Sequence, residues 1–451
     1  MRASLREQFG QVLRQGLPLA LGIGSQALFN LVDLVIVGRL GPSAVAGAHV
    51  ATTINFLPMI LGNGVSVAAL ARISQRLGAG EHAAARALAA RAQWLMLGLG
   101  LLLGGLGAAI AAPCVDLQGV TGEARRVGVH YLVVSQLGCL TMFALMQTTA
   151  NMRAVGESMM PLWLLVGSNL LNVGFDLLLI FGWDALAIPA FGAPGAAYGT
   201  VAARGVGAVC GYLWLARRQH GLRFSFAERL QRPPPGEFRQ LLLLSLPQSV
   251  QMFVRAAVVI ALTRIAADVA GEAAVTSLGV TTRLDTLVLF ASVGFASVGT
   301  TLCGRALGAG RVAAARAVAL AAGLCAGGFG LLVTGLLALF AAPILRLFVA
   351  DAGPEVVAAG TGYLRIALLA QPLAAFALGA TGGIHGSGNM LPPMLLDLIG
   401  YLLVLLPVAI VLASVGGGIT LEQLFWLVAA ANLLLAGGYL LYLWRGRWPR
   451  V

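Results

Sequence analysis

The sequence has little charge and no lysine. Only 10% of its 451 residues are charged, 59% are hydrophobic, and all 29 basic residues are arginine. A soluble protein would carry roughly a quarter charged residues. The shortage of charge therefore indicates a membrane protein. The lack of lysine, beside abundant alanine and glycine, is interpreted as a bias of composition.

Cysteine is also scarce, and its spacing excludes the usual disulfide and metal patterns. No two of the five cysteines are close in sequence, and most lie in apolar runs, so we interpret them as small buried hydrophobic residues. The five histidines are isolated as well. The sequence thus predicts no metal centre and no organic cofactor. The cysteines are Cys114, Cys139, Cys210, Cys303 and Cys325.

Long apolar runs occupy most of the chain. We find twelve of about 20 residues, the length of a helix that spans the hydrocarbon core. No small-residue cleavage site ends the first run, so we interpret it as a retained span and not as a signal peptide. The expected fold is an all-α integral membrane protein with twelve transmembrane helices. The runs are 17–38, 46–70, 92–113, 129–150, 161–182, 195–216, 241–263, 275–300, 317–342, 362–380, 393–415 and 421–444.

The arginines are unevenly distributed among the predicted loops. Twenty of the 29 fall in the two termini and the even-numbered loops, and about five fall in the odd-numbered loops. Basic residues concentrate on the cytoplasmic side of membrane proteins, so both termini are predicted in the cytoplasm, with the chain in the cytoplasmic (inner) membrane. The net charge of +12 is then a topology signal, with membrane lipids and not nucleic acid as its partner.

The two halves of the chain repeat each other. The loop after the second run reads RLGAGEHAAARA (76–87), and the loop after the eighth reads ALGAGRVAAARA (306–317). Nine of the twelve positions are identical at an offset of 230. These glycine-rich loops lack GxxxxGK[ST], so we interpret them as turns and not as a nucleotide site. Other landmarks repeat at nearly the same offset: Pro18 with Pro247, Tyr131 with Tyr363, and Pro161 with Pro393.

The repeat predicts two domains of six spans each. Six spans give both halves the same orientation, an arrangement that occurs in alternating-access transporters. The predicted boundaries are an N-terminal lobe at 1–216, a cytoplasmic linker at 217–240 and a C-terminal lobe at 241–451.

Polar residues lie on one side of the first run. Gln26, Asn30 and Asp33 are spaced i, i+4, i+7 and therefore share one helical face. Asp33 lies 15 residues after Pro18. At the rise of an α-helix that is roughly 22 Å, in the outer half of the membrane. Gln26 and Asn30 are candidates to line a substrate cavity.

The fifth run carries a matching polar stripe. Asn169, Asn172 and Asp176 are spaced i, i+3, i+7, and Asp176 lies 15 residues after Pro161. If the two stripes face each other, two aspartates with amide neighbours meet in a low-dielectric site. Burial and mutual repulsion both favour a protonated carboxyl, so the pair could exchange a proton. Alternatively Asp33, Asn172 and Asp176 could bind Na⁺, or the aspartates could serve only helix packing.

The second half lacks this pair, because Leu262 and Val408 occupy the equivalent positions. Charged residues occur there at other places within the spans. Arg255, Arg283 and Asp285 are candidates to line a substrate cavity, but they could also be structural. In particular, Arg255 and Asp285 fall near mid-span on consecutive helices and could form an ion pair. The charged residues are Arg255, Arg283, Asp285 and Asp397.

Three segments carry a resemblance to a known family. NLVDLVIVGRLG (30–41), the repeated LGAG…AAAR loops, and NLLNVGFDLLLIFG (169–182) with the following FGAPGAAYGTVAA resemble the multidrug and toxic compound extrusion (MATE) transporters. The resemblance extends over essentially the whole chain. It implies two six-helix lobes that form a V.

The resemblance also implies a function. MATE transporters export amphipathic, often cationic drugs in antiport with H⁺ or Na⁺, by a rocker-switch motion. Carried over, Asp33 and Asp176 would be the cation-coupling carboxylates, assisted by Asn172 and Tyr131. Thr200 is a further candidate for the same pocket. The protein would be a multidrug efflux transporter and a monomer, without enzymatic activity.

One departure from the family bears on the coupling site. One branch places a glutamate eight residues after the proline that opens the seventh span, where this sequence has Arg255. The resemblance therefore points to the branch whose coupling site is in the N-terminal lobe.

Three other classes of membrane protein are alternatives to a drug exporter. A flippase for lipid-linked oligosaccharides belongs to the same wider superfamily, and Arg204, Arg255 and Arg283 match its need for cationic residues in the cavity. A polyprenyl-linked transferase would need acidic motifs in loops or a large extramembrane domain. The major facilitator fold would need an Asp-Arg-rich loop between the second and third spans. Neither set of features is visible in the sequence.

Overall fold

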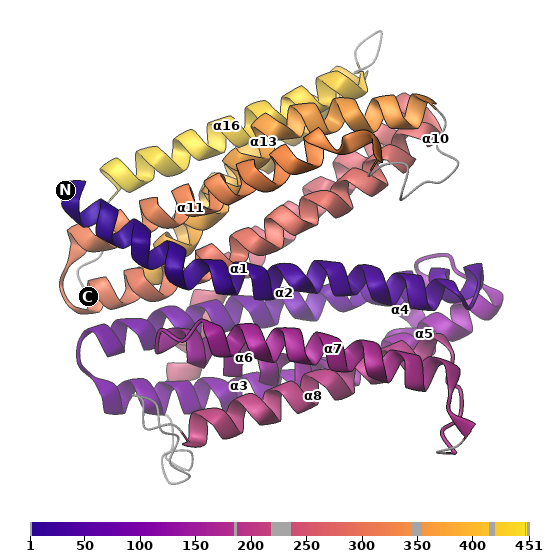
Figure 1. The fold of residues 1–451 in the computed structure, drawn as a ribbon, viewed down its shortest axis with the longest axis horizontal. Coiled ribbons are helices and arrows are strands. Elements are labelled where there is room, and N and C mark those ends of the chain that lie inside the picture. The colour runs from indigo at the N-terminus through magenta and orange to yellow at the C-terminus, as the bar shows by residue number, and fades with distance from the viewer. Residues whose placement is uncertain are drawn as a thin grey trace. The chain divides into compact units, whose positions relative to one another are not determined.

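The structure is a computed structural model, shown in Figure 1. It describes residues 2–184, 187–217, 236–343, 354–414, 420–446 and 448. Within these ranges the side chains of residues 2–4, 31, 268–284, 354–356 and 359 are not described. Most of the predicted linker 217–240 therefore lies outside the described residues.

Each of the twelve predicted runs falls on a helix, which confirms the all-helical membrane fold. In the described part of the chain, ten helices are long and apolar enough to cross a membrane. There are eleven if α5 (Gly122–Leu137) and α6 (Cys139–Ala154), which meet at a bend of 42°, form one span. The run 195–216 forms α8 (Ala193–Arg217), whose glycines and Arg204 lower its hydropathy, and it is not among the ten.

The chain packs into two compact units. The N-unit is Ser25–Leu246, and the C-unit is Met1–Gly24 together with Pro247–Val451. The predicted lobe limits follow the order of the spans, whereas these units divide two helices internally. The first helix, α1 (Arg2–Gly38), is divided after Gly24. The helix α10 (Glu237–Gly308) is divided after Leu246.

Among its described residues, the N-unit holds seven complete helices and parts of two others. The helices are the end of α1 (Arg2–Gly38), then α2 (Pro42–Gly78), α3 (His82–Ala109), α4 (Ala111–Asp116), α5, α6, α7 (Met159–Phe181), α8, and the beginning of α10 (Glu237–Gly308).

The C-unit differs from the prediction at two places. The helix α10 is continuous across the loop expected between the seventh and eighth runs. The eleventh run contains an eight-residue π-helix, η2, directly after Asp397. The helices are the beginning of α1, the rest of α10, α11 (Val312–Leu339), α13 (Pro354–Gly386), α14 (Leu391–Asp397), η2 (Leu398–Leu405), α15 (Leu406–Ser414) and α16 (Leu421–Arg445).

Small residues let the helices of each unit approach closely. In the C-unit, a Cβ added to Gly383 of α13 would overlap Ala319 of α11. In the N-unit, a Cβ added to Gly104 of α3 would overlap the backbone carbonyl of Gln136 in α5. Membrane helices rely on such close packing because lipid is as apolar as leucine. The abundant alanine and glycine therefore have a structural role.

Large apolar side chains cover the outside of the helices. On α7, Trp163, Leu170 and Leu177 are spaced by seven residues and are 62%, 60% and 49% exposed. A soluble monomer rarely exposes an apolar surface of this extent. This face of α7 therefore suits lipid contact, and its opposite face is free to carry polar groups.

A buried ion cluster fixes the beginning of α10 in the N-unit. The Glu237 carboxylate lies 2.9 Å from Nη1 of Arg91 on α3 and 3.6 Å from Nη2 of Arg76 at the end of α2. The side chains of Glu237 and Arg91 are only 8% and 11% exposed. Removing one partner of such a pair leaves a buried charge uncompensated.

We therefore expect Glu237→Gln to lower the free energy of unfolding by about 3 kcal/mol. The measurement is thermal unfolding of the purified protein in detergent. The matched control is Glu123→Gln, which removes an exposed carboxylate from its pair with Arg126 and should change stability by less than about 1 kcal/mol. Equal melting temperatures for the two variants would show that the buried cluster does not stabilise the unit.

Candidate functional site

The polar face of α7 points into the N-unit. Ser168, Asn172 and Asp176 are spaced by four residues and are 6%, 7% and 0% exposed. Their spacing places them along one side of the helix. This inner face differs from the predicted stripe by one member, because Ser168 lies on it while Asn169 is only half-buried.

Asn172 links Asp176 to the next helix. Its Nδ2 atom donates hydrogen bonds to Oδ1 of Asp176, at 2.9 Å, and to Oγ1 of Thr200 on α8, at 3.3 Å. The structure thus brings together three of the predicted residues. Gly199 lies beside Thr200, and a Cβ at that position would overlap Oδ1 of Asp176. The absence of a side chain at Gly199 is therefore what admits the carboxyl between α7 and α8.

The Asp33 carboxyl of α1 meets the Asp176 carboxyl within hydrogen-bonding reach. An ionised carboxylate only accepts hydrogen bonds, so two such groups can share a bond only when one carries a proton. Each also keeps a buried oxygen, Oδ1 of Asp33 and Oδ2 of Asp176, with no hydrogen-bond partner among the described residues. The site therefore holds two carboxyls and too few donors to satisfy them.

Two further groups surround the carboxyl pair. Tyr131 of α5 lies within electrostatic range of both aspartates. The assisting role that the resemblance implies for Tyr131 stays a prediction. Arg204 of α8 lies within electrostatic range of Asp33 and Tyr131. From the sequence, Arg204 is a candidate only for a flippase. Its position one helical turn after Thr200 is the signal that could place it at this site.

The remaining members of the predicted stripes contribute less. Asn169 donates from Nδ2 to Oγ of Ser25 at 3.4 Å and so ties α7 to α1. Gln26 is half-buried and Asn30 is exposed. No hydrogen bond joins either to the aspartates among the described side chains.

The ion pair considered between Arg255 and Asp285 does not form. Nε of Arg255 instead lies 2.5 Å from Oδ2 of Asp397. Asp397 is fully buried, so its charge needs a cation close by. Asp285 accepts a hydrogen bond from the hydroxyl of Tyr363. Arg283, the remaining candidate of this half, has a side chain outside the described residues.

Asp397 is the centre of a satisfied network in the C-unit. In addition to Arg255, it accepts hydrogen bonds from Nε2 of Gln251 at 2.9 Å and from the hydroxyl of Tyr439 at 2.8 Å. Three donors from α10 and α16 therefore fix this carboxylate at the start of η2. The contrast with the N-unit pair is clear, because here the carboxylate has a permanent cation.

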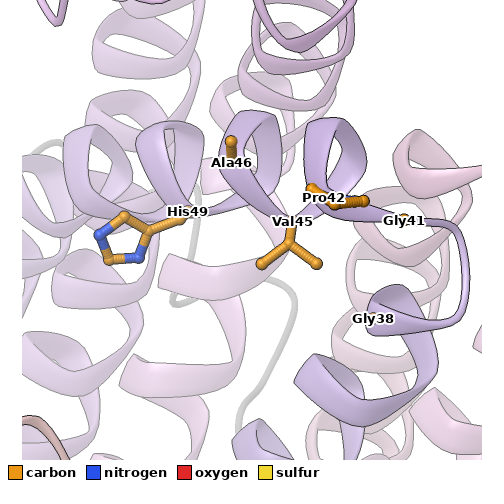
Figure 2. A pocket seen from close by; sticks show the side chains of 6 residues that line it. All are labelled: Gly38, Gly41, Pro42, Val45, Ala46 and His49. Atoms are coloured by element: carbon orange, nitrogen blue, oxygen red, sulfur yellow. The ribbon is translucent and has the colours of Figure 1, made fainter. Parts of the chain in front are cut away.

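A surface hollow lies at the turn between α1 and α2. Figure 2 shows its lining, which consists mostly of small and apolar residues with His49 at one side. None of the predicted site residues lines it. The lining residues are Gly38, Gly41, Pro42, Val45, Ala46 and His49.

Comparison with protein families identifies the class. The MatE family model matches residues 18–178 and again residues 247–411. The two matches begin at Pro18 and Pro247, the prolines that aligned the predicted repeat, and together they cover most of the chain. The chain therefore belongs to the MATE family of membrane transporters, which confirms the resemblance found in the sequence.

Individual relatives and structures agree with this assignment. The chain is 25% identical over 419 residues to a probable multidrug resistance protein NorM of Thermotoga maritima, covering 91% of this chain and 87% of the relative. It is 24% identical to the probable multidrug resistance protein YpnP of Bacillus subtilis, over 97% and 96% of the two chains. The fold is similar to a crystal structure of the Vibrio cholerae MATE transporter VcmN, with a TM-score of 0.88 and 21% identity over 98% of each chain.

The close approach at Gly199 gives a test of the site geometry. Gly199→Ala should destabilise the protein by about 1–3 kcal/mol, because the added methyl group must displace the Asp176 carboxyl from Asn172. The measurement is thermal unfolding in detergent. Combining Gly199→Ala with Asp176→Ala removes the collision, so the two changes should be strongly non-additive.

Gly174→Ala on α7 is the matched control for that test. A Cβ at Gly174 meets nothing within 4 Å, so this variant should be as stable as the wild type or slightly more stable. Additive effects of Gly199→Ala and Asp176→Ala would contradict the described packing.

Proposed function

We propose that this protein is a secondary active exporter of amphipathic, often cationic compounds, driven by protons that bind at Asp33 and Asp176. The observation that carries the proposal is the facing pair of carboxyls, each with an unpartnered buried oxygen. Ionisable groups inside a membrane are expensive to keep and usually mark ion pathways. A pair with an incomplete set of donors is suited to gaining and losing a cation.

The orientation of the neighbours favours H⁺ over Na⁺ as that cation. The Asn172 amide presents its Nδ2 hydrogens to Asp176, and not its oxygen. A Na⁺ ion would require oxygen ligands on several sides, whereas a proton needs only the contact between the two carboxyls. A hydrogen bond between the two carboxyls would itself need one proton.

Proton binding would drive export by changing the balance between two conformations. With both carboxyls deprotonated, their repulsion opposes the close approach of α1 and α7. With a proton between them, the approach becomes favourable. A bound ion shifts such an equilibrium only by its difference in affinity for the two states. Alternate loading of protons outside and substrate inside would then give antiport by a rocker-switch motion.

The relatives support the kind of substrate. Both NorM of Thermotoga maritima and YpnP of Bacillus subtilis are named as probable multidrug resistance proteins. We carry the substrate class over from them, together with a place in the cytoplasmic membrane and both termini on the cytoplasmic side. The excess of arginine in the termini and even-numbered loops supports this orientation.

The flippase alternative has less support from the side chains. It rested on arginines that could bind a lipid phosphate. Arg255 is neutralised by Asp397, and Arg204 lies within electrostatic range of Asp33. Arg255 is therefore not available to bind a lipid phosphate, and the proposal remains drug export.

The proposal predicts the effect of neutral isosteres at the carboxyl pair. Asp33→Asn and Asp176→Asn should each reduce proton-driven export of a fluorescent cationic dye to the level of vesicles without the protein, because neither amide can take up and release the proton. The measurement uses inverted vesicles, with a pH gradient and a Na⁺ gradient imposed separately. Asp116→Asn, which removes an exposed carboxyl paired with Arg125, should export normally.

Each other outcome has a definite meaning. Export that follows the Na⁺ gradient and is lost in both variants would replace H⁺ by Na⁺ at the same site. Normal export by both variants would show that the aspartates serve only packing. A wild type that exports no dye under either gradient would overturn drug export and favour the flippase.

A further inference from the structure

A second unpaired carboxyl lies in the C-unit. Asp285 of α10 is half-buried and accepts a hydrogen bond from the hydroxyl of Tyr363 on α13. The side chain of Gln371, two turns further along α13, also lies within hydrogen-bonding reach of it. Both neighbours are neutral. Among the described residues no basic side chain forms an ion pair with Asp285, so its described polar contacts are with neutral groups.

The internal repeat shows that helix packing at this position does not need a charge. At the offset of 230 residues, Asp285 corresponds to Asn55 in the N-unit. The helix partners correspond as well, because Gln371 matches Cys139 at the offset of 232 that aligns the two tyrosines. Sγ of Cys139 lies 3.9 Å from Oδ1 of Asn55. The same helix contact thus forms in the N-unit with a neutral amide in place of the carboxylate.

The ring of Tyr363 lies beside the Asp285 carboxyl, and a second ring packs against it. The rings of Tyr363 and of Phe425 on α16 meet edge to face, with centroids 4.6 Å apart and an interplanar angle of 79°. A carboxylate beside aromatic rings is the combination that attracts organic cations, through charge and through the negative faces of the rings. The Tyr363 hydroxyl is turned toward Asp285, so it orients the carboxylate and keeps the ring beside it.

We propose that Asp285, with Tyr363 and Phe425, binds the cationic group of the exported compound. This proposal rests on the proposed function and deepens it, because it assigns substrate recognition to the C-unit while the proton site is in the N-unit. The two cations then have separate carboxyls. Protons would release the substrate by shifting the conformation, and not by competing for the same carboxylate.

The test measures equilibrium binding of tetraphenylphosphonium, a permanent organic cation, to the purified full-length protein in detergent without any gradient. Asp285→Asn should weaken the affinity about tenfold, the effect of losing an ionic partner of about 1.4 kcal/mol. Binding of triphenylphosphine oxide, a neutral compound with the same rings, should change less than about twofold. Asp285→Glu keeps a carboxylate and should recover most of the affinity for the cation.

Two controls separate this proposal from the proposed function. Asp184→Asn removes an exposed carboxyl outside the site and should bind the cation like the wild type. Asp33→Asn should lose proton-driven export but, whatever its overall affinity, should still prefer tetraphenylphosphonium over triphenylphosphine oxide. Unchanged binding by Asp285→Asn would overturn the assignment of this site and leave drug export standing. A wild type that neither binds the cation nor exports dye would overturn both.

Discussion

The hydrogen bond between Asn172 and Asp176 sets the arrangement of the N-unit around it. A polar group inside a bilayer has no water to form hydrogen bonds with, so its hydrogen-bond partners must come from the protein. This requirement turns one face of α7 inward and leaves its leucines outside. It also requires α8 to approach closely, which Gly199 permits because it has no side chain to collide with the carboxyl. Thr200, next in sequence, then completes the link between the two helices.

The two units treat a buried carboxylate in opposite ways. Asp397 has Arg255, Gln251 and Tyr439 as donors, so its charge is compensated at all times. A compensated ion pair has little to gain from another cation. Among the described side chains, the polar contacts of Asp176 are the Asn172 amide and a second carboxyl, so no cation is fixed beside it by an ion pair. Of the two sites, this one is therefore the one to which we assign the proposed proton.

Much of this arrangement followed from the sequence, and the reasons for the exceptions are physical. The lengths of the apolar runs predicted the helices, because hydrophobic length is a local property of the chain. The repeat of Pro18 at Pro247 predicted two similar halves, and the family model matches each half from these prolines. The equal distance of Asp33 and Asp176 from their prolines predicted that both lie at one depth, and it left open whether they face each other. Whether the aspartates carry a coupling ion stays a prediction.

Contacts between distant helices were harder to predict. The partner of Arg255 is on α14, and periodicity along one helix does not say which of several carboxylates it reaches. Arg255 pairs with Asp397, which is fully buried, and not with the half-buried Asp285. An unpaired charge would cost more free energy at the more buried of the two carboxylates. The π-helix that follows Asp397 also left no signal in composition.

The same duplication explains why the polar sites are not symmetric. Gln26 and Arg255 both lie eight residues after the prolines that open their halves, and Asn55 corresponds to Asp285. Glycine, alanine and leucine carry the packing in both units, so polar positions could change charge while the helices kept their places. Because Arg255 neutralises Asp397, the C-unit keeps Asp285 as a half-buried carboxylate without an ion-pair partner among the described side chains. A repeat with diverged polar positions thus offers two different sites on one framework, one for the proposed proton and one for the proposed substrate.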